Sequence, residues 1–202
     1  PRRIRMVYSL MFSLPGAPVL YYGEEIGMGE NPTISGSRAA VRTPMQWTAD
    51  VDAGFSGADE LIADVVPGGF APEHVNVAQQ RRDPDSMLRF TQNLVRQYRA
   101  SPEIGWGEFG ILDQPHACVL AHSVTSELGM LVAAHNFAPD GRTFRLRIEG
   151  ADADADADAD AETWRLVDLL DDAGGAQTLD GDGFEVTLDG YGYRWWRVIR
   201  PG

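Results

Sequence analysis

The sequence predicts a mixed architecture in which an α/β portion comes first and an all-β portion follows. Two observations predict it. Near the N-terminus a helical pattern, a Pro-Gly turn and a short apolar run follow one another, and after Pro102 short β-type runs alternate with turns. Helix, tight turn and buried strand make one step of a parallel α/β architecture, whereas closely spaced short strands are typical of an antiparallel sandwich.

The first predicted element is a helix from about Arg2 to Leu14, which Pro15 and Gly16 end. Its apolar residues recur at spacings of three and four on one face: Ile4, Val7, Met11 and Leu14. The run from Pro18 to Tyr22 shows no alternation of polar and apolar residues, which is the pattern of a strand buried on both faces.

A long Gly- and Pro-rich stretch from Gly23 to about Glu73 follows, and a loop of this length inside a domain is usually functional. A short helix is expected at His74 to Arg82, and an amphipathic helix runs from Asp83 to about Ala100. Its apolar stripe consists of Met87, Leu88, Thr91, Leu94, Val95 and Tyr98. We place the domain boundary near Pro102, so that the domains comprise residues 1–102 and 103–202.

The second half contains seven candidate strands separated by turns. They are Glu108 to Leu112, Ala117 to Thr125, Met130 to Asn136, Thr143 to Glu149, Trp164 to Leu170, Phe184 to Leu188 and Tyr193 to Ile199. Between Phe144 and Ile148 apolar residues alternate strictly with arginines, so one face of that strand is expected to be buried.

Composition excludes several classes of function. The formal net charge of -13 argues against nucleic acid or anionic membranes as partners, because both require clustered cations. No apolar run approaches the length of a membrane-spanning helix. Cys118 is the single cysteine, which rules out a disulfide framework and a cysteine-based metal site, and we interpret it as a small buried hydrophobe.

The remaining candidate ligands give no metal or cofactor assignment. The four histidines have no metal-binding spacing: His74, His116, His122 and His135. Asp152 to Asp160 alternate with alanines, and Asp-x-Asp-x-Asp begins a calcium-binding EF-hand loop, but Ala157 and Thr163 stand where such a loop has its glycine and its glutamate. A mutually repelling, disordered loop is the simpler interpretation of this run. We expect a cytoplasmic protein, although the chain begins at Pro1 and its true start can lie upstream.

Three motifs in order resemble one enzyme family. Leu14 to Met28 reads Leu-Pro-Gly-Ala-Pro-Val-Leu-Tyr-Tyr-Gly-Glu-Glu-Ile-Gly-Met, Arg42 to Trp47 reads Arg-Thr-Pro-Met-Gln-Trp, and Ala53 to Ser56 reads Ala-Gly-Phe-Ser. This series resembles the eighth strand and following loop of the α-amylase family of glycoside hydrolases, and within it the trehalose synthase and α-glucosidase branch. The resemblance therefore implies the terminal portion of a (β/α)8 TIM barrel followed by an antiparallel β-sandwich.

The family's chemistry is retaining, with one carboxylate attacking the anomeric carbon and a second protonating the leaving oxygen. The resemblance places those carboxylates on earlier barrel strands, so we nominate no catalytic residue and predict that this chain alone is inactive. Glu24 and Glu25 are adjacent in a segment expected to be extended and would project to opposite sides, so we interpret them as structural carboxylates.

Arg42 is the one candidate for substrate binding. In the α-glucosidase branch the arginine of this motif holds hydroxyls of the terminal glucose, and a planar fork of donors suits that task. An ion pair that pins the long loop is the alternative. Trp47 and Trp106 are sugar-stacking candidates, but we interpret each as a buried anchor.

Three functions follow. The chain is the C-terminal part of an enzyme acting on α-linked glucosides such as maltose, trehalose or short glucans, or a stand-alone carbohydrate-binding fragment, or a product without activity. Gly36 to Ala40 departs from the Asp-Arg-Asn-Gly pattern usual in trehalose synthases, so isomerase and hydrolase both stay open.

Overall fold

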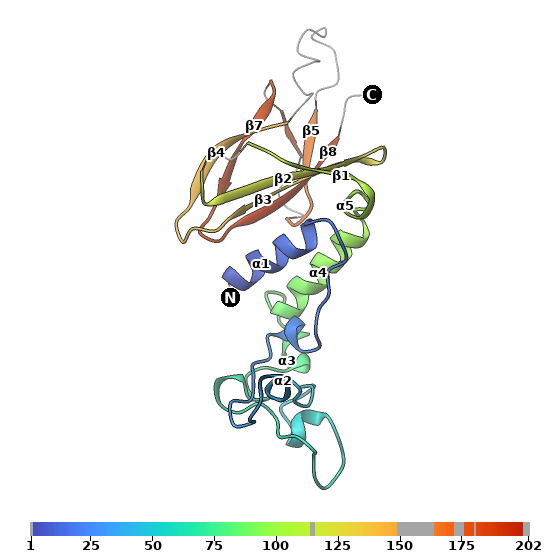
Figure 1. Ribbon diagram of the computed structural model, residues 1–202, viewed down its shortest axis with the longest axis vertical. Helices are drawn as coiled ribbons and strands as arrows, with labels where there is room; N and C mark the ends of the chain where they lie inside the picture. Colours follow the sequence, from blue (N-terminus) through green and yellow to red (C-terminus); the bar gives the residue numbers. More distant parts are fainter. Residues whose placement is uncertain (1, 114–115, 149–163, 172–175, 180, 200–202) are drawn as a thin grey trace. The chain divides into compact units, whose positions relative to one another are not determined.

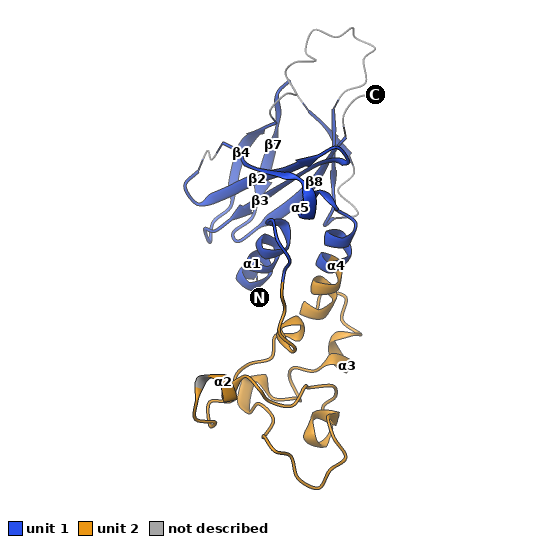
Figure 2. Cartoon of the chain, turned by 45° about the vertical axis from the view of Figure 1, so that its right-hand side comes forward, with its two compact units in different colours: residues 1–18, 94–202 blue, residues 19–93 orange. Residues whose placement is uncertain are grey.

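The computed structural model describes residues 2–113, 116–148, 164–171, 176–179 and 181–199. These residues form two compact units, one made of residues 1–18 with 94–202 and the other of residues 19–93 (Figures 1 and 2). The expected division at residue 102 concerned the domains of the family and stays a prediction. The Ala-Asp run from residue 151 to residue 161 lies outside the described residues.

The larger unit is built on two antiparallel sheets. The six-stranded sheet has the order β1(Glu108–Ile111), β2(Val119–Ser126), β3(Gly129–Asn136), β8(Tyr193–Ile199), β5(Arg165–Asp168), β6(Ala176–Thr178). The second sheet pairs β4(Arg142–Arg147) with β7(Gly183–Leu188). The seven expected strands are all present within a few residues of their predicted ends. The exposed strand β6 has three residues, of which only Ala176 is apolar, which is why periodicity did not reveal it.

One apolar core joins the two sheets. Every second residue of β4 and β7 points into it, and Phe144, Leu146 and Val186 are buried while the arginines between them are exposed. The six-stranded sheet contributes Val132, Leu166, Trp196 and Val198, among others. The predicted alternation in β4 is therefore confirmed, and burial of these side chains on both sheets supplies the main favourable free energy of this unit.

Helix α1(Arg2–Ser13) packs against β3 and β8 on the opposite face of the six-stranded sheet (Figure 1). The helix is confirmed, but the predicted face is not the one that packs. Met6, Ser9 and Phe12 are buried, whereas Ile4 and Val7 are exposed. Ser9 lies on the buried face because polar side chains of the sheet need hydrogen-bond partners. Trp195 Nε1 donates to Ser9 Oγ at 2.9 Å, and Ser9 Oγ lies 3.0 Å from His135 Nε2.

Two histidines lie buried beneath α1. His122 Nε2 donates to the carbonyl oxygen of Ser13 at 3.0 Å, and its ring stacks on His135 with centroids 5.8 Å apart and planes 2° apart. Burial lowers the pKa of His122, and burial together with the neighbouring His122 lowers the pKa of His135 to about 3. Both rings are therefore neutral in the folded protein at neutral pH, and each has a hydrogen-bond partner on α1.

One of the two connections between the units is a helix in the middle of the chain. Helix α4(Met87–Arg99) begins after Ser86, whose Oγ accepts the N–H of Arg89. It buries Leu88, Thr91 and Leu94 of its predicted stripe, whereas Val95 is 36% exposed. The four-residue helix α5(Glu103–Trp106) follows, and Gly107 then allows a close approach: a Cβ there would stand 2.6 Å from the carbonyl oxygen of Glu103. No helix in the described part of the chain is long and apolar enough to cross a membrane.

The strand expected at Pro18 to Tyr22 is absent, which corrects that prediction. Residues 17–21 carry no β pairing among the described residues, and Val19 is 82% exposed. The physical reason is that a parallel strand forms only through backbone hydrogen bonds to neighbouring strands. The described residues offer no neighbouring strand here. Apolar composition alone cannot supply the pairing.

The smaller unit consists of loops, short turns and the start of α4. Its elements are η1(Glu24–Ile26), α2(Ser37–Ala40), η2(Val51–Gly54), η3(Gly68–Phe70) and α3(Val77–Gln80). Ile26, Met45, Val77 and Leu88 form a small core. Asn31 ties two loops together, since its N–H donates to the carbonyl of Ala40 and its Nδ2 to that of Val65. Side-chain amides thus replace the regular ladders that this unit lacks.

Candidate functional site

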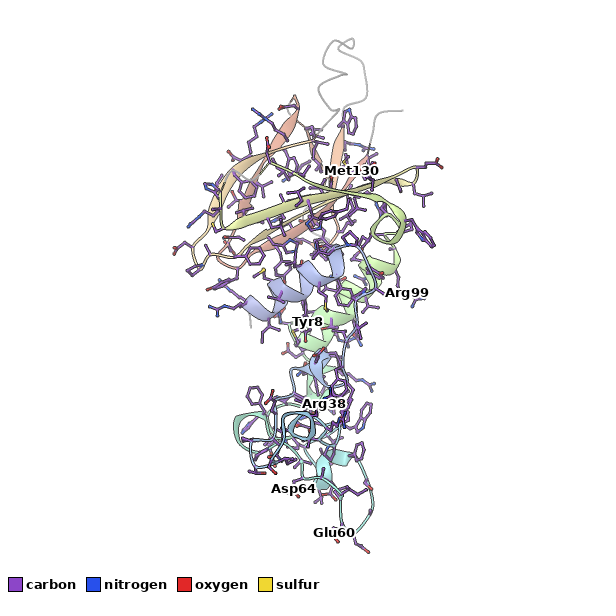
Figure 3. All side chains as sticks on the ribbon, in the orientation of Figure 1. Tyr8, Arg38, Glu60, Asp64, Arg99 and Met130 are labelled. Atoms are coloured by element: carbon purple, nitrogen blue, oxygen red, sulfur yellow. The ribbon has the colours of Figure 1, made fainter. Side chains whose placement is uncertain are left out.

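A cleft of about 760 Å³ lies entirely within the smaller unit. Its volume is in the range of small-molecule sites. The motif from Arg42 to Trp47 forms one wall, and the loop of residues 55–63 forms another. Figure 3 labels Glu60, a lining residue on that second loop. The full lining comprises Tyr22, Glu25, Arg42, Thr43, Pro44, Met45, Trp47, Phe55, Ser56, Ala58, Glu60, Leu61, Ile62 and Ala63.

Hydrogen bonds on both sides hold the segment from Thr43 to Trp47 in place. Tyr22 donates its hydroxyl to the Thr43 carbonyl at 2.8 Å, and the N–H of Val77 donates to the Gln46 carbonyl at 3.0 Å. The fully buried Gln46 donates its Nε2 to the carbonyl of Phe70, and also to that of Val75. The motif that carries the family resemblance is therefore held on both sides by hydrogen bonds.

Arg42 lies on the cleft with its side chain exposed. Within the described residues the structure records no ion pair or hydrogen bond to its guanidinium, so the alternative role of pinning the loop has no partner there. Burial and the neighbouring Tyr21 raise the pKa of Tyr22, and the positive charge of Arg42 opposes that rise. The guanidinium is thus close enough to Tyr22 to act on it, and Arg42 is among the residues that line the cleft.

Two exposed aromatic side chains flank a tight turn on the cleft. The N–H groups of Trp47 and Thr48 both donate to the carbonyl of Ala53, at 2.9 and 3.0 Å, and close the turn. Trp47 stays 45% exposed and Phe55 51% exposed. The interpretation of Trp47 as a buried anchor is therefore wrong: its backbone is anchored, while its ring faces the cleft. Phe55 belongs to the Ala-Gly-Phe-Ser motif, and its position on the cleft depends on this turn.

The backbone of the turn is strained. Asp52 and Ala53 adopt the left-handed conformation, with φ of 53° and 56°, and Gly54 follows with φ of 64°. L-residues other than glycine avoid this region because Cβ crowds the backbone. The side chain of Ala53 is wholly buried, so only a small residue fits there. The turn therefore suits the small residues Ala53 and Gly54 of the motif.

Glu24 and Glu25 lie in a single 3-10 turn and not in an extended segment, which corrects that expectation. Glycines in the left-handed conformation, Gly23 and Gly27, bound the turn. Each carboxylate accepts a nearby backbone N–H: Glu24 from Tyr21 at 3.0 Å and Glu25 from Gly23 at 2.8 Å. Both therefore stabilise the local chain path, and Glu25 also lines the cleft.

The other candidates lie in the larger unit. Trp106 is 88% exposed and is not a buried anchor, since the four-residue helix α5 ends there and offers no covering layer. Cys118 is partly buried against the core. In the described part of the chain no three His, Cys, Asp or Glu side chains gather in a way that suits a metal ion.

We expect Gly54→Ala to lower the free energy of unfolding by roughly 1–2 kcal/mol. An added Cβ would meet Thr48 Oγ1 at 2.4 Å, and it would sit on a residue with positive φ. Thermal denaturation followed by circular dichroism measures the change. Gly57→Ala is the matched control, because a Cβ there meets nothing within 4 Å and its φ is not positive. Equal melting temperatures for the two variants would contradict the strain argument.

The sequence and the fold both match known proteins. Residues 1–107 match the family model described as α-amylase, catalytic domain, and residues 129–197 match that of the sucrose hydrolase-like C-terminal domain. The trehalose synthase/amylase TreS of Mycobacterium tuberculosis is 41% identical over 123 residues, covering 59% of this chain and 20% of that protein. The trehalose synthase of Thermus thermophilus is 34% identical over 152 residues, covering 73% of this chain and 16% of that protein.

Among solved structures, the trehalulose synthase MutB from Pseudomonas mesoacidophila MX-45 superimposes with a TM-score of 0.73. It is 18% identical, and the match covers 98% of this chain and 38% of that one. This likeness concerns the fold, whereas the match to the α-amylase catalytic domain covers more than half of the chain and defines its class. The chain belongs to the α-amylase family of glycoside hydrolases. It spans about a fifth of the length of the trehalose synthases that it matches.

Proposed function

We propose that this chain is the C-terminal part of a retaining enzyme that acts on α-linked glucosides, either by isomerising maltose and trehalose or by hydrolysis. The observation that carries the proposal is the cleft. Arg42, with no partner among the described residues, shares it with two exposed aromatic side chains, within the residues that match the catalytic domain. Forked donors beside apolar ring faces are the groups that recognise a sugar's hydroxyls and its C–H surface.

The proposal includes the end of a (β/α)8 barrel in residues 1–102. The exposed apolar side chains on α1, Ile4 and Val7, and on the segment at Val19, support it. In a barrel, the helices pack outside a ring of paired strands, so these positions would be covered and the residues at Val19 would gain a ladder. We propose that the carboxylates that break the glycosidic bond lie on other strands of that barrel.

The direct test compares this 202-residue chain with the full-length protein. Each is incubated with maltose, and the products are followed by chromatography. We expect glucose or trehalose from the full-length protein, and no turnover above the uncatalysed rate from the shorter chain. Turnover by the 202 residues alone would show that the carboxylates are in this chain after all, and that outcome would overturn the division proposed here.

A carbohydrate-binding fragment without catalysis is the second candidate. The observation that favours it is that residues 19–93 form the cleft by themselves. Calorimetry of this chain with millimolar maltose tests it: we expect a measurable heat of binding that Arg42→Ala weakens at least tenfold. A heat signal unchanged by Arg42→Ala would remove Arg42 from the site, and no heat at all would remove the stand-alone role.

We propose a cytoplasmic location and a neutral glucoside as the partner. The lone Cys118 supports the location, because disulfides belong mainly to oxidising compartments. The net charge of -13 supports an uncharged ligand over a phosphorylated one.

A further inference from the structure

Trp47 and Phe55 leave about half of each large apolar side chain in contact with water, on the same cleft. They are eight positions apart in the sequence. The closed turn brings them together, because the backbone N–H groups of Trp47 and Thr48 both bind the carbonyl of Ala53, two residues before Phe55. Exposed aromatic side chains that gather on one cleft mark a binding surface.

The chain holds this arrangement against its own conformational preference. Asp52 and Ala53 adopt the left-handed region, which non-glycine residues avoid. A strained backbone of this kind persists where the surroundings force it, and such residues cluster at ligand sites. Here the strained turn lies directly between the two aromatic residues in the sequence. None of its residues belongs to the apolar core of the larger unit. Strain and aromatic exposure therefore point to the same place.

The cleft also has a polar portion, formed by Arg42, Glu25 and Glu60. Two carboxylates and one guanidinium disfavour an anionic ligand, so a sugar phosphate fits less well than a neutral sugar. A pyranose ring presents C–H groups on its faces and hydroxyls at its edge. Aromatic rings suit the faces, and a donor fork suits the hydroxyls.

We propose that Trp47 and Phe55 form a stacking subsite for the second pyranose ring of an α-linked disaccharide, whose first ring binds at Arg42. This inference rests on the proposed glucoside-binding function and extends it to residues that set the preferred length of the ligand. The aromatic subsite adds apolar contact only when a second ring is present. The cleft therefore prefers maltose to glucose, and the preference comes from these two side chains.

Saturation-transfer NMR on the 202-residue chain tests the subsite, because it detects weak binding of sugars. Aromatic protons of the protein are saturated, and the signals of glucose and of maltose are read in separate samples. We expect saturation to reach one ring of maltose more strongly than the other. Titration gives the dissociation constants, and we expect maltose to bind about tenfold more tightly than glucose.

The variants separate the two proposals. Trp47→Ala and Phe55→Ala should each weaken maltose binding about three- to tenfold and leave glucose binding unchanged, whereas Arg42→Ala should weaken both sugars. Trp47→Phe keeps a ring and should keep most of the preference. Trp106→Ala is the matched control, because Trp106 is exposed but lies outside the cleft.

Two further outcomes would decide whether the subsite and the proposed function hold. If Arg42→Ala weakens both sugars while the aromatic variants keep the preference for maltose, the subsite is wrong and the proposed function stands. If neither sugar receives saturation, the stand-alone binding role and the subsite both fail, whereas turnover of maltose by the full-length protein decides the enzyme proposal. Circular dichroism of each variant confirms that its fold is intact, and the exposure of both side chains makes a folded variant the expected result.

Discussion

Arg197→Ala should lower the free energy of unfolding by about 3–5 kcal/mol. Glu103 is only 2% exposed, and Arg197 is its partner: the guanidinium Nε lies 3.2 Å from Glu103 Oε1 and Nη2 donates to Oε2 at 3.3 Å. Nη2 also donates to the Ala100 carbonyl and to Ser101 Oγ, each at 3.0 Å. Removing the arginine leaves the buried Glu103 carboxylate without its charged partner. It also leaves the acceptors at the end of α4 without this hydrogen-bond donor.

Urea denaturation gives the free energy, and an unchanged m-value would show that the two-state analysis holds. Arg147→Ala is the control, since the Arg147 side chain is 66% exposed and that of its ion-pair partner Asp182 is 39% exposed. Ion pairs in contact with solvent contribute about 0–1 kcal/mol. Adding Glu103→Gln to Arg197→Ala should recover part of the loss, because the buried charge is then gone. Equal losses for Arg197→Ala and Arg147→Ala would show that the buried network does not matter.

Lowering the pH from 7 to 5 should destabilise the larger unit through its buried histidine pair, with His135 alone contributing roughly 2 kcal/mol. The folded-state pKa of His135 is about 3, whereas an unfolded histidine binds its proton near pH 6.5. Between these values the unfolded chain binds more protons, so stability is full above pH 6.5 and is lost as the pH falls. The lowered pKa of His122 acts in the same direction.

Replacing His135 by glutamine removes this titration and keeps a polar group opposite Ser9. The free energy of unfolding of the variant, measured by urea denaturation at pH 7 and pH 5, should fall by less than that of the natural sequence. His74→Gln is the matched control, because His74 is exposed in the other unit and meets water in both states. A pH effect that persists undiminished without His135 would contradict the assignment.

Much of the larger unit could be predicted from the sequence because its signals are local. The alternation of Phe144, Leu146 and Ile148 with arginines specified a half-buried strand, and the structure confirms it. The stripe of α4 specified both a helix and its buried face. The face of α1 was mispredicted since apolar spacing cannot show that Trp195 and His135 will need the hydroxyl of Ser9.

The prediction of a strand near Val19 is wrong for a related reason. A parallel strand depends on its neighbours, and nothing within its own residues reveals whether they are present. The aromatic pair was missed because Trp47 and Phe55 are separated by a turn that no simple pattern predicts. Only the two N–H groups bound to the Ala53 carbonyl place them on one cleft.

The sequence by itself determined the family, the sheet-forming half and the candidacy of Arg42, because motifs and periodicities are written in consecutive residues. Tertiary structure alone decided which side chains face the cleft and which polar groups lie under α1. It also decided which backbone N–H groups donate to the carboxylates of Glu24 and Glu25. Those outcomes depend on contacts between distant residues: a hydroxyl from one element must meet a ring from another before either can be buried.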